Sequence, residues 1–314
     1  MRGSSVLISS WSDGLFTLSP DGQAHELEGR GVAGLVSDGR SGAVAVVDRT
    51  ALMRRSAERE WSELATSELR MTCCLAVDEA VYAGTEGAHL LRVRGEGPVE
   101  RVDAFDVVDG CETWFAGSTV VDGEVVGPPL EVRSLTGSSD GRVLLAGVHV
   151  GGIPRSVDGG LTWHPTIDVA WDVHEVCIHP ENPETVIAAC ALGLGVSMDG
   201  GASWTLDRPG SEETHCSAVV FSGGDLLVSV SDGPFASHGT VLRRPIDAPG
   251  SLTPIGGGLP DRLDGKVDTG CIASKGSELA VVDWGGNVYA SDDGGRRWTR
   301  LAEGIPEPSG ALIL

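Results

Sequence analysis

SVDGGLTW (Ser156–Trp163), SMDGGASW (Ser197–Trp204) and SDDGGRRW (Ser291–Trp298) are three copies of one pattern. In each copy, the Asp carboxylate and the Ser hydroxyl can bond backbone N–H groups inside a tight turn. The glycines adopt φ values that other residues resist, and the Trp begins the next strand and buries a large ring. Three copies with the same Ser-to-Trp spacing therefore predict three equivalent β-hairpins.

The distances between the copies indicate a repeated four-stranded unit. Ser156 and Ser197 lie 41 residues apart, and Ser197 and Ser291 lie 94 apart, which corresponds to two repeats of 47. A period of roughly 40–50 residues in a sheet-forming sequence is typical of propeller blades. Alignment of the remaining sequence to these copies predicts six blades, at about 30–67, 70–107, 128–168, 171–210, 213–258 and 266–306.

The two ends of the chain together predict a seventh blade. VLISSWSDGLFTLSPDGQAHEL (6–27) supplies three strands, and SGALIL (309–314) supplies one. A blade shared in this way leaves no open sheet edge. We therefore expect an all-β fold: one domain over residues 1–314, a seven-bladed β-propeller closed by a C-terminal strand that joins the N-terminal blade.

The three motifs match the Asp-box, and the chain resembles the Asp-box (BNR) repeat β-propellers, a family that includes sialidases and sortilin-type receptor domains. The resemblance implies the propeller with Asp-box hairpins and transfers no catalytic residue. Sialidases carry an early F/Y-R-I-P motif and a Tyr nucleophile. Here Gly152 replaces the Arg of that motif, and neither Tyr82 nor Tyr289 starts a strand at the channel mouth. Sialidase activity is not expected.

Composition limits the classes of partner. The net charge of −22 argues against nucleic acids and anionic membranes. The first residues lack the apolar core of a signal peptide, and no apolar run approaches the ~20 residues of a spanning helix. The seven cysteines do not form the pattern of a disulfide framework. We expect a cytoplasmic protein that binds neither nucleic acid nor membrane.

Overlaying the aligned blades places polar residues at one repeated position, the start of the innermost strand. These residues are Arg70, Arg133, His174, His215 and Asp268. Innermost strands surround the central channel of a propeller, and the ends of the second strands share that face. The second strands add His149 and Trp284. Convergent polar residues at one mouth are the default location of a ligand site.

An insertion over residues 108–127 separates the third and fourth blades. A loop of this length in a compact domain is usually functional. We expect it to open onto the same mouth, where Glu112 can act as a general base or a further metal ligand. Trp114 of the insertion and Trp284 are expected to contact the substrate.

Two chemistries fit these residues. Imidazoles with one carboxylate suit a divalent transition metal such as zinc, copper, iron or manganese, with His149, His174, His215 and Asp268 as ligands. Alternatively, Arg70 and Arg133 can hold a carboxylate or phosphate bidentately.

The two chemistries combine into a metal-dependent enzyme that acts on a small anionic molecule. The sequence leaves two other classes open: a non-catalytic scaffold or assembly propeller with a protein partner, and a small-molecule sensor. An enzyme needs a pocket with perturbed titrating groups, whereas a scaffold needs exposed aromatic residues on a flat face.

Overall fold

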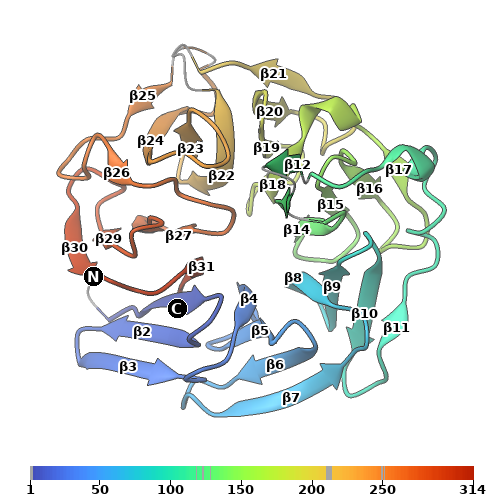
Figure 1. The fold of residues 1–314 in the computed structure, drawn as a ribbon, viewed down its shortest axis with the longest axis horizontal. Coiled ribbons are helices and arrows are strands. Elements are labelled where there is room, and N and C mark those ends of the chain that lie inside the picture. Colours follow the sequence, from blue (N-terminus) through green and yellow to red (C-terminus); the bar gives the residue numbers. More distant parts are fainter. Residues whose placement is uncertain are drawn as a thin grey trace.

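The computed structural model describes residues 3–117, 119–121, 124–127, 129–209, 214–248, 250 and 252–314. In this part of the chain, seven antiparallel sheets surround a central axis (Figure 1). The expected seven-bladed β-propeller is confirmed.

The first blade contains both ends of the chain. Its strand order is β3-β2-β1-β31, so the C-terminal strand is the innermost one. β1 pairs with β31 in antiparallel register, with Val6 opposite Ile313 and Ile8 opposite Ala311. This pairing confirms the predicted closure, and Figure 1 shows the C-terminal end of the chain in the same blade as β2 and β3. The strands are β1 (Val6–Ser10), β2 (Leu15–Ser19), β3 (Gly22–Glu26) and β31 (Pro308–Ile313).

The next three blades run in chain order from the innermost strand outward. The second comprises β4 (Val32–Ser37), β5 (Ala43–Val47), β6 (Ala51–Arg55) and β7 (Trp61–Thr66). The third comprises β8 (Met71–Val77), β9 (Ala80–Thr85), β10 (Leu90–Arg94) and β11 (Glu100–Arg101). The fourth comprises β14 (Val132–Gly137), β15 (Leu144–Val148), β16 (Pro154–Ser156) and β17 (His164–Pro165).

The last three blades repeat this arrangement. The fifth comprises β18 (Val173–Ile178), β19 (Val186–Cys190), β20 (Gly193–Ser197) and β21 (Thr205–Asp207). The sixth comprises β22 (His215–Ser222), β23 (Asp225–Ser231), β24 (His238–Pro245) and β25 (Thr253–Pro254), and β26 (Leu263–Asp264) also pairs with β24. The seventh comprises β27 (Ile272–Lys275), β28 (Glu278–Val282), β29 (Val288–Ser291) and β30 (Thr299–Ala302).

Short elements lie between these blades. The insertion forms the 3-10 helix η1 (Cys111–Thr113) and a hairpin of β12 (Thr119–Val121) and β13 (Glu124–Val126). A second 3-10 helix, η2 (Val169–Trp171), precedes β18. Among the described residues there is no helix of the length and apolar character needed to cross a membrane.

The core lies between neighbouring blades. The second strand of a blade is buried on both faces, so β5 (AVAVV), β15 (LLAGV) and β19 (VIAAC) are continuous apolar runs of small and β-branched residues. Small residues let adjacent sheets approach closely. A Cβ on Gly84 of β9 would lie 2.6 Å from the Cβ of Val132 in the next blade.

The three repeated hairpins make the hydrogen bonds that the sequence predicts. Asp158 Oδ1 accepts from the backbone N–H groups of Leu161 and Thr162 at 3.0 and 2.9 Å, and Ser156 Oγ accepts from Gly160 N at 2.9 Å. Gly160 has a φ of 84°, as the turn requires. Asp199 and Asp293 make the same pair of backbone contacts in their own hairpins. These carboxylates therefore stabilise turns.

Candidate functional site

A cavity of about 670 Å³ opens where the inner strands begin. Six residues singled out in the sequence line it: Arg133, His149, His174, His215, Asp268 and Trp284. The lining also includes residues to which the sequence assigned no role, among them Trp11, Arg49, Glu131, Asp172, Phe235 and Lys266.

Three histidines from adjacent blades gather on one side of this cavity. His149 directly follows β15, His174 is the second residue of β18, and His215 begins β22. The ring centroids of His149 and His174 lie 5.7 Å apart, and those of His174 and His215 lie 4.6 Å apart. His149 and His174 are buried, and His215 is partly exposed.

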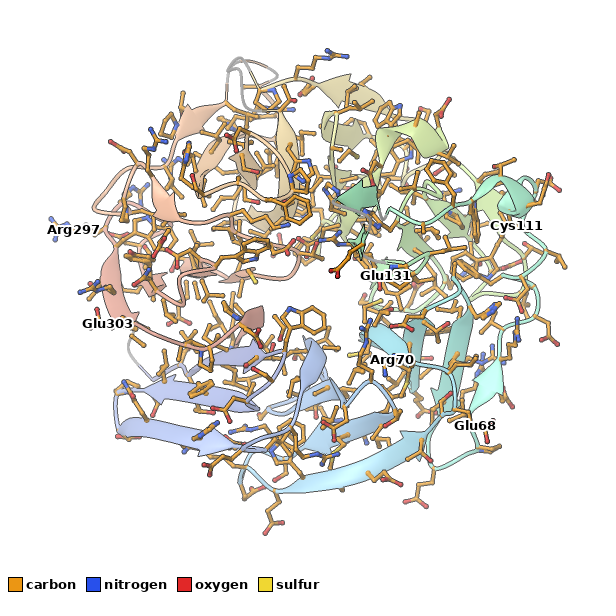
Figure 2. All side chains as sticks on the ribbon, viewed as in Figure 1. Glu68, Arg70, Cys111, Glu131, Arg297 and Glu303 are labelled. Carbon is orange, nitrogen blue, oxygen red and sulfur yellow. The ribbon has the colours of Figure 1, made fainter. Side chains whose placement is uncertain are left out.

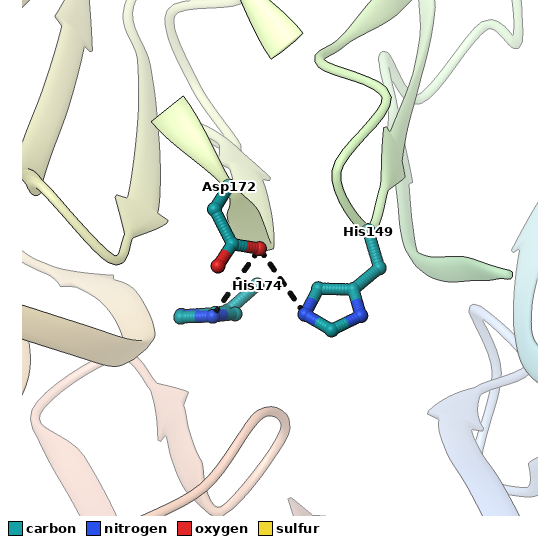
Figure 3. Close-up of side chains that lie close together, drawn as sticks. All are labelled: His149, Asp172 and His174. Atoms are coloured by element: carbon teal, nitrogen blue, oxygen red, sulfur yellow. Dashed lines mark ion pairs between the residues drawn. The ribbon is translucent and has the colours of Figure 1, made fainter. Parts of the chain in front are cut away.

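Asp172 lies between the first two histidines (Figure 3). Its Oδ1 atom is 3.1 Å from His149 Nε2 and 3.8 Å from His174 Nε2. The ligand atoms of these three residues all lie within 4.8 Å of one another. Asp172 ends η2 with a φ of 53°, a left-handed conformation that Asp tolerates better than most residues.

The hydrogen bonds of His174 fix its tautomer. Its Nδ1 atom is 2.5 Å from the carbonyl oxygen of Cys216, and because a carbonyl only accepts, Nδ1 carries the hydrogen. Burial, with the charges of Arg133 and His215, lowers the pKa of His174 well below its usual value. The ring is therefore neutral, and the lone pair on Nε2 faces Asp172.

Asp172 is ionised opposite that lone pair. Burial alone would raise its pKa, but the hydrogen-bond contact with His149 and the positive charge of Arg133 lower it to about 2. Its Oδ1 atom is buried and has no aligned hydrogen-bond donor among the described residues. A carboxylate oxygen and an imidazole lone pair thus face each other without a positive group between them, an arrangement that a bound cation stabilises.

Asp268 has different partners from those expected. Its Oδ1 accepts from Arg133 Nη2 at 2.9 Å, and its Oδ2 is 3.2 Å from Lys266 Nζ. Burial raises the pKa of Asp268, but Arg133 and Lys266 lower it far below its usual range. Because two cations occupy this carboxylate, Asp172 rather than Asp268 is the acidic member of the histidine group.

His215 lies beside that group and remains neutral at pH 7. Burial, followed by the positive charge of Lys266, lowers its pKa to about 4. The ligand atoms that converge within 4.8 Å belong to His149, Asp172 and His174, so His215 neighbours the cluster without belonging to it. The role of His215 as a metal ligand stays a prediction.

Arg70 is not among the residues that line the cavity. Its side chain, labelled in Figure 2, is 53 % exposed. Its Nε atom is 3.1 Å from Glu86 Oε1. Arg49 lines the cavity instead, with Nη1 3.1 Å from Glu86 Oε1 and Nη2 3.5 Å from Glu131 Oε2. Arg70 directly precedes β8 and shares Glu86 Oε1 with Arg49, so Arg49 rather than Arg70 presents its side chain to the cavity.

The insertion approaches the mouth with its second half. Glu112 lies exposed in η1, whose first residue, Cys111, is at the outer edge of the molecule in Figure 2. Trp114 packs against Phe105, with ring centroids 5.8 Å apart. Neither Glu112 nor Trp114 lines the cavity: Glu112 is exposed, and Trp114 packs against the buried cluster that contains Phe105.

Gly117 brings the insertion back to the site. A Cβ at this position would lie 2.0 Å from His149 Cε1, so only glycine allows this approach. Gly127 also lines the cavity. Residues 118, 122 and 123 of the insertion lie outside the described residues.

Similar solved structures are propellers with different activities. A GH74 enzyme from Niastella koreensis is 18% identical to this chain, with a TM-score of 0.62. The matched region covers 94% of this chain and 46% of the Niastella chain. A GH74 xyloglucanase from Xanthomonas campestris is 18% identical, with a TM-score of 0.59. The matched region covers 95% of this chain and 46% of the xyloglucanase. The WD40 repeats of RRP9 are 11% identical, with a TM-score of 0.59. The matched region covers 87% of this chain and 80% of the RRP9 chain.

These likenesses support the fold alone. The chain spans about half the length of the GH74 structures. No family model and no curated protein matches the sequence.

Proposed function

We propose that the cavity binds a divalent transition metal through His149 Nε2, His174 Nε2 and the Asp172 carboxylate, and that the protein is a metal-dependent enzyme acting on a small anionic molecule. The observation that carries this proposal is the lone pair of His174 facing the buried, ionised Asp172 at 3.8 Å. Two imidazole nitrogens and one carboxylate oxygen are a ligand set that zinc and related ions prefer.

The surroundings of this group fit a metal site. His174 donates its other ring N–H to a backbone carbonyl, which is the usual way of orienting a ligating imidazole. Three protein ligands leave coordination positions open, as catalytic sites do. A bound ion of this kind supplies Lewis acidity toward a substrate or water. His215, neutral at pH 7 and lining the same cavity, is placed to take up a proton there.

A second candidate is a non-catalytic interaction propeller. The exposed Phe235 at the rim of the cavity supports it. We also propose, on the geometry of the three hairpins, that the chain belongs with the Asp-box propellers.

Zinc titration by calorimetry tests the proposal. We expect the metal-free protein to bind one equivalent of Zn²⁺, and both His174→Ala and Asp172→Asn to weaken binding by about 100-fold or more, since each removes a ligand. His164→Ala is the matched control because His164 is exposed on the outer strand β17. Zinc affinity equal in His174→Ala and the unaltered protein would overturn the proposal.

A further inference from the structure

The cavity has an aromatic side opposite in character to its histidine side. Trp11, Phe235 and Trp284 are 47%, 62% and 41% exposed, and all three line the cavity. They lie on the loops that follow β1, β23 and β28, which belong to the first, sixth and seventh blades. These blades adjoin around the ring, whereas His149 and His174 lie on the fourth and fifth. Large exposed rings grouped at a cavity mark a binding surface.

A buried cation lies on this aromatic side. The chain has only two lysines, and Lys266 is one of them, with a side chain that is 7% exposed. Its Nζ atom lies 4.5 Å from the ring centroid of Trp284. The ammonium group and the indole therefore form one surface that joins positive charge to a flat apolar ring.

Lys266 shares its ion-pair partner with a second cation. Arg133 and Lys266 share a single carboxylate, that of Asp268. The next carboxyl, Glu175, accepts from the backbone N–H groups of Val219 and Gly270 at 2.9 and 3.2 Å. A buried ammonium group that shares its counter-ion in this way retains the capacity to donate a hydrogen bond to a further acceptor. A ligand carboxylate in the cavity would be such an acceptor.

We propose that the cavity binds a small aromatic carboxylate, with the carboxylate group at Lys266 and the ring against Trp284. This inference deepens the proposed function, because such a molecule would be the substrate of the proposed enzyme. Only its role as substrate rests on the proposed function; its binding does not. A carboxylate accepts charge-assisted hydrogen bonds from the Lys266 ammonium group. A planar ring buries the exposed aromatic surface in an offset or edge-to-face contact. A cavity of about 670 Å³ accommodates a molecule of this size.

Calorimetric titration with benzoate tests this inference on protein stripped of metal with EDTA and on zinc-loaded protein. We expect benzoate to bind in both states, and benzamide, its neutral analogue, to bind at least about tenfold more weakly. D-glucuronate, a ring carboxylate without an aromatic face, is also expected to bind more weakly. Equal affinity for benzoate and benzamide, tighter binding of glucuronate, or no benzoate binding in either state would overturn the inference.

Two variants locate the binding. Lys266→Met should weaken benzoate binding about tenfold or more, whereas Lys275→Met, which alters the other and exposed lysine, should leave it unchanged. Trp284→Leu tests the ring contact without removing charge and should also weaken binding. Unchanged benzoate affinity in both Lys266→Met and Trp284→Leu would place the ligand elsewhere and refute the inference. Benzoate binding is measured on metal-free protein, whereas the metal proposal is tested by zinc titration of His174→Ala. Failure of the metal proposal is therefore distinguishable from failure of this inference.

Discussion

Single residues decide whether the mouth is a polar channel or a binding site. His174 is held in one tautomer by Cys216, and Asp172 is held ionised in front of it. Neither residue alone is unusual in a protein interior. Together they place two hydrogen-bond acceptors, His174 Nε2 and Asp172 Oδ1, opposite each other. This arrangement is unfavourable unless a cation or a water molecule lies between the two atoms.

The overlay of blades predicted part of this site from the sequence. Arg133, His174 and His215 line the cavity because strand periodicity places equivalent residues at equivalent depths. Asp172 was missed because its position depends on a left-handed φ at the end of η2. The spacing Asp172-Val-His174 could have revealed it, since residues i and i+2 of an extended segment face the same side.

The carboxylate of Asp199 should matter for stability alone. Asp199→Ala strands the N–H groups of Ala202 and Ser203 in a partly solvated turn, so we expect a loss on the order of 1 kcal/mol in unfolding free energy at pH 7. Hydrogen bonds, first that from the Ser203 hydroxyl, lower the pKa of Asp199 to about 2. Its stabilising contribution is therefore complete above about pH 4 and is lost as the pH falls through 2.

Urea denaturation at pH 7 and at pH 2–4 measures this effect, with the exposed Asp232→Ala as control. The difference between Asp199→Ala and the unaltered protein should shrink over that acid range. Zinc binding should stay unchanged in Asp199→Ala. A variant that kept its stability and lost zinc would contradict the structural role of this carboxylate.

Among the elements, β31 has the largest effect on closure. It pairs with β1, and Ser309 Oγ donates to the carbonyl oxygen of Val32 at 2.5 Å, which links the first blade to the second. Deleting residues 308–314 exposes the edge of β1 and removes the buried Ile313. We expect the melting temperature to fall by roughly 10 °C or more.

Calorimetry on the deletion variant measures this change. Deletion of Leu314 alone is the control, because it leaves β31 (Pro308–Ile313) complete. A melting temperature that did not change after removal of residues 308–314 would show that the ring does not depend on this strand.

The insertion shows where sequence reasoning about elements fails. Its length indicated function, and Gly117 does contact the His149 ring. The expected roles of Glu112 and Trp114 required their side chains to point into the mouth. Trp114 instead packs against Phe105 and its buried cluster, and Glu112 is exposed. An irregular segment has no periodicity from which such packing could be derived.

At the scale of the molecule, the fold followed from the sequence because the signal is repeated. Three hairpin motifs fix the period, and the period fixes the number of blades and the need for a closing strand. The chemistry of the mouth is not repeated, since each blade contributes a different side chain. Propellers of the same shape have unrelated functions, so the activity has to be argued from the site.

Anomalous diffraction from crystals saturated with zinc tests the central claim most directly. We expect one anomalous peak in the cavity, about 2.0–2.2 Å from the Nε2 atoms of His149 and His174 and from a carboxylate oxygen of Asp172. The same experiment on Asp172→Asn crystals should show a weaker peak or none. A strong peak elsewhere in the molecule, or an empty cavity in saturated crystals of the unaltered protein, would contradict metal binding by His149, Asp172 and His174.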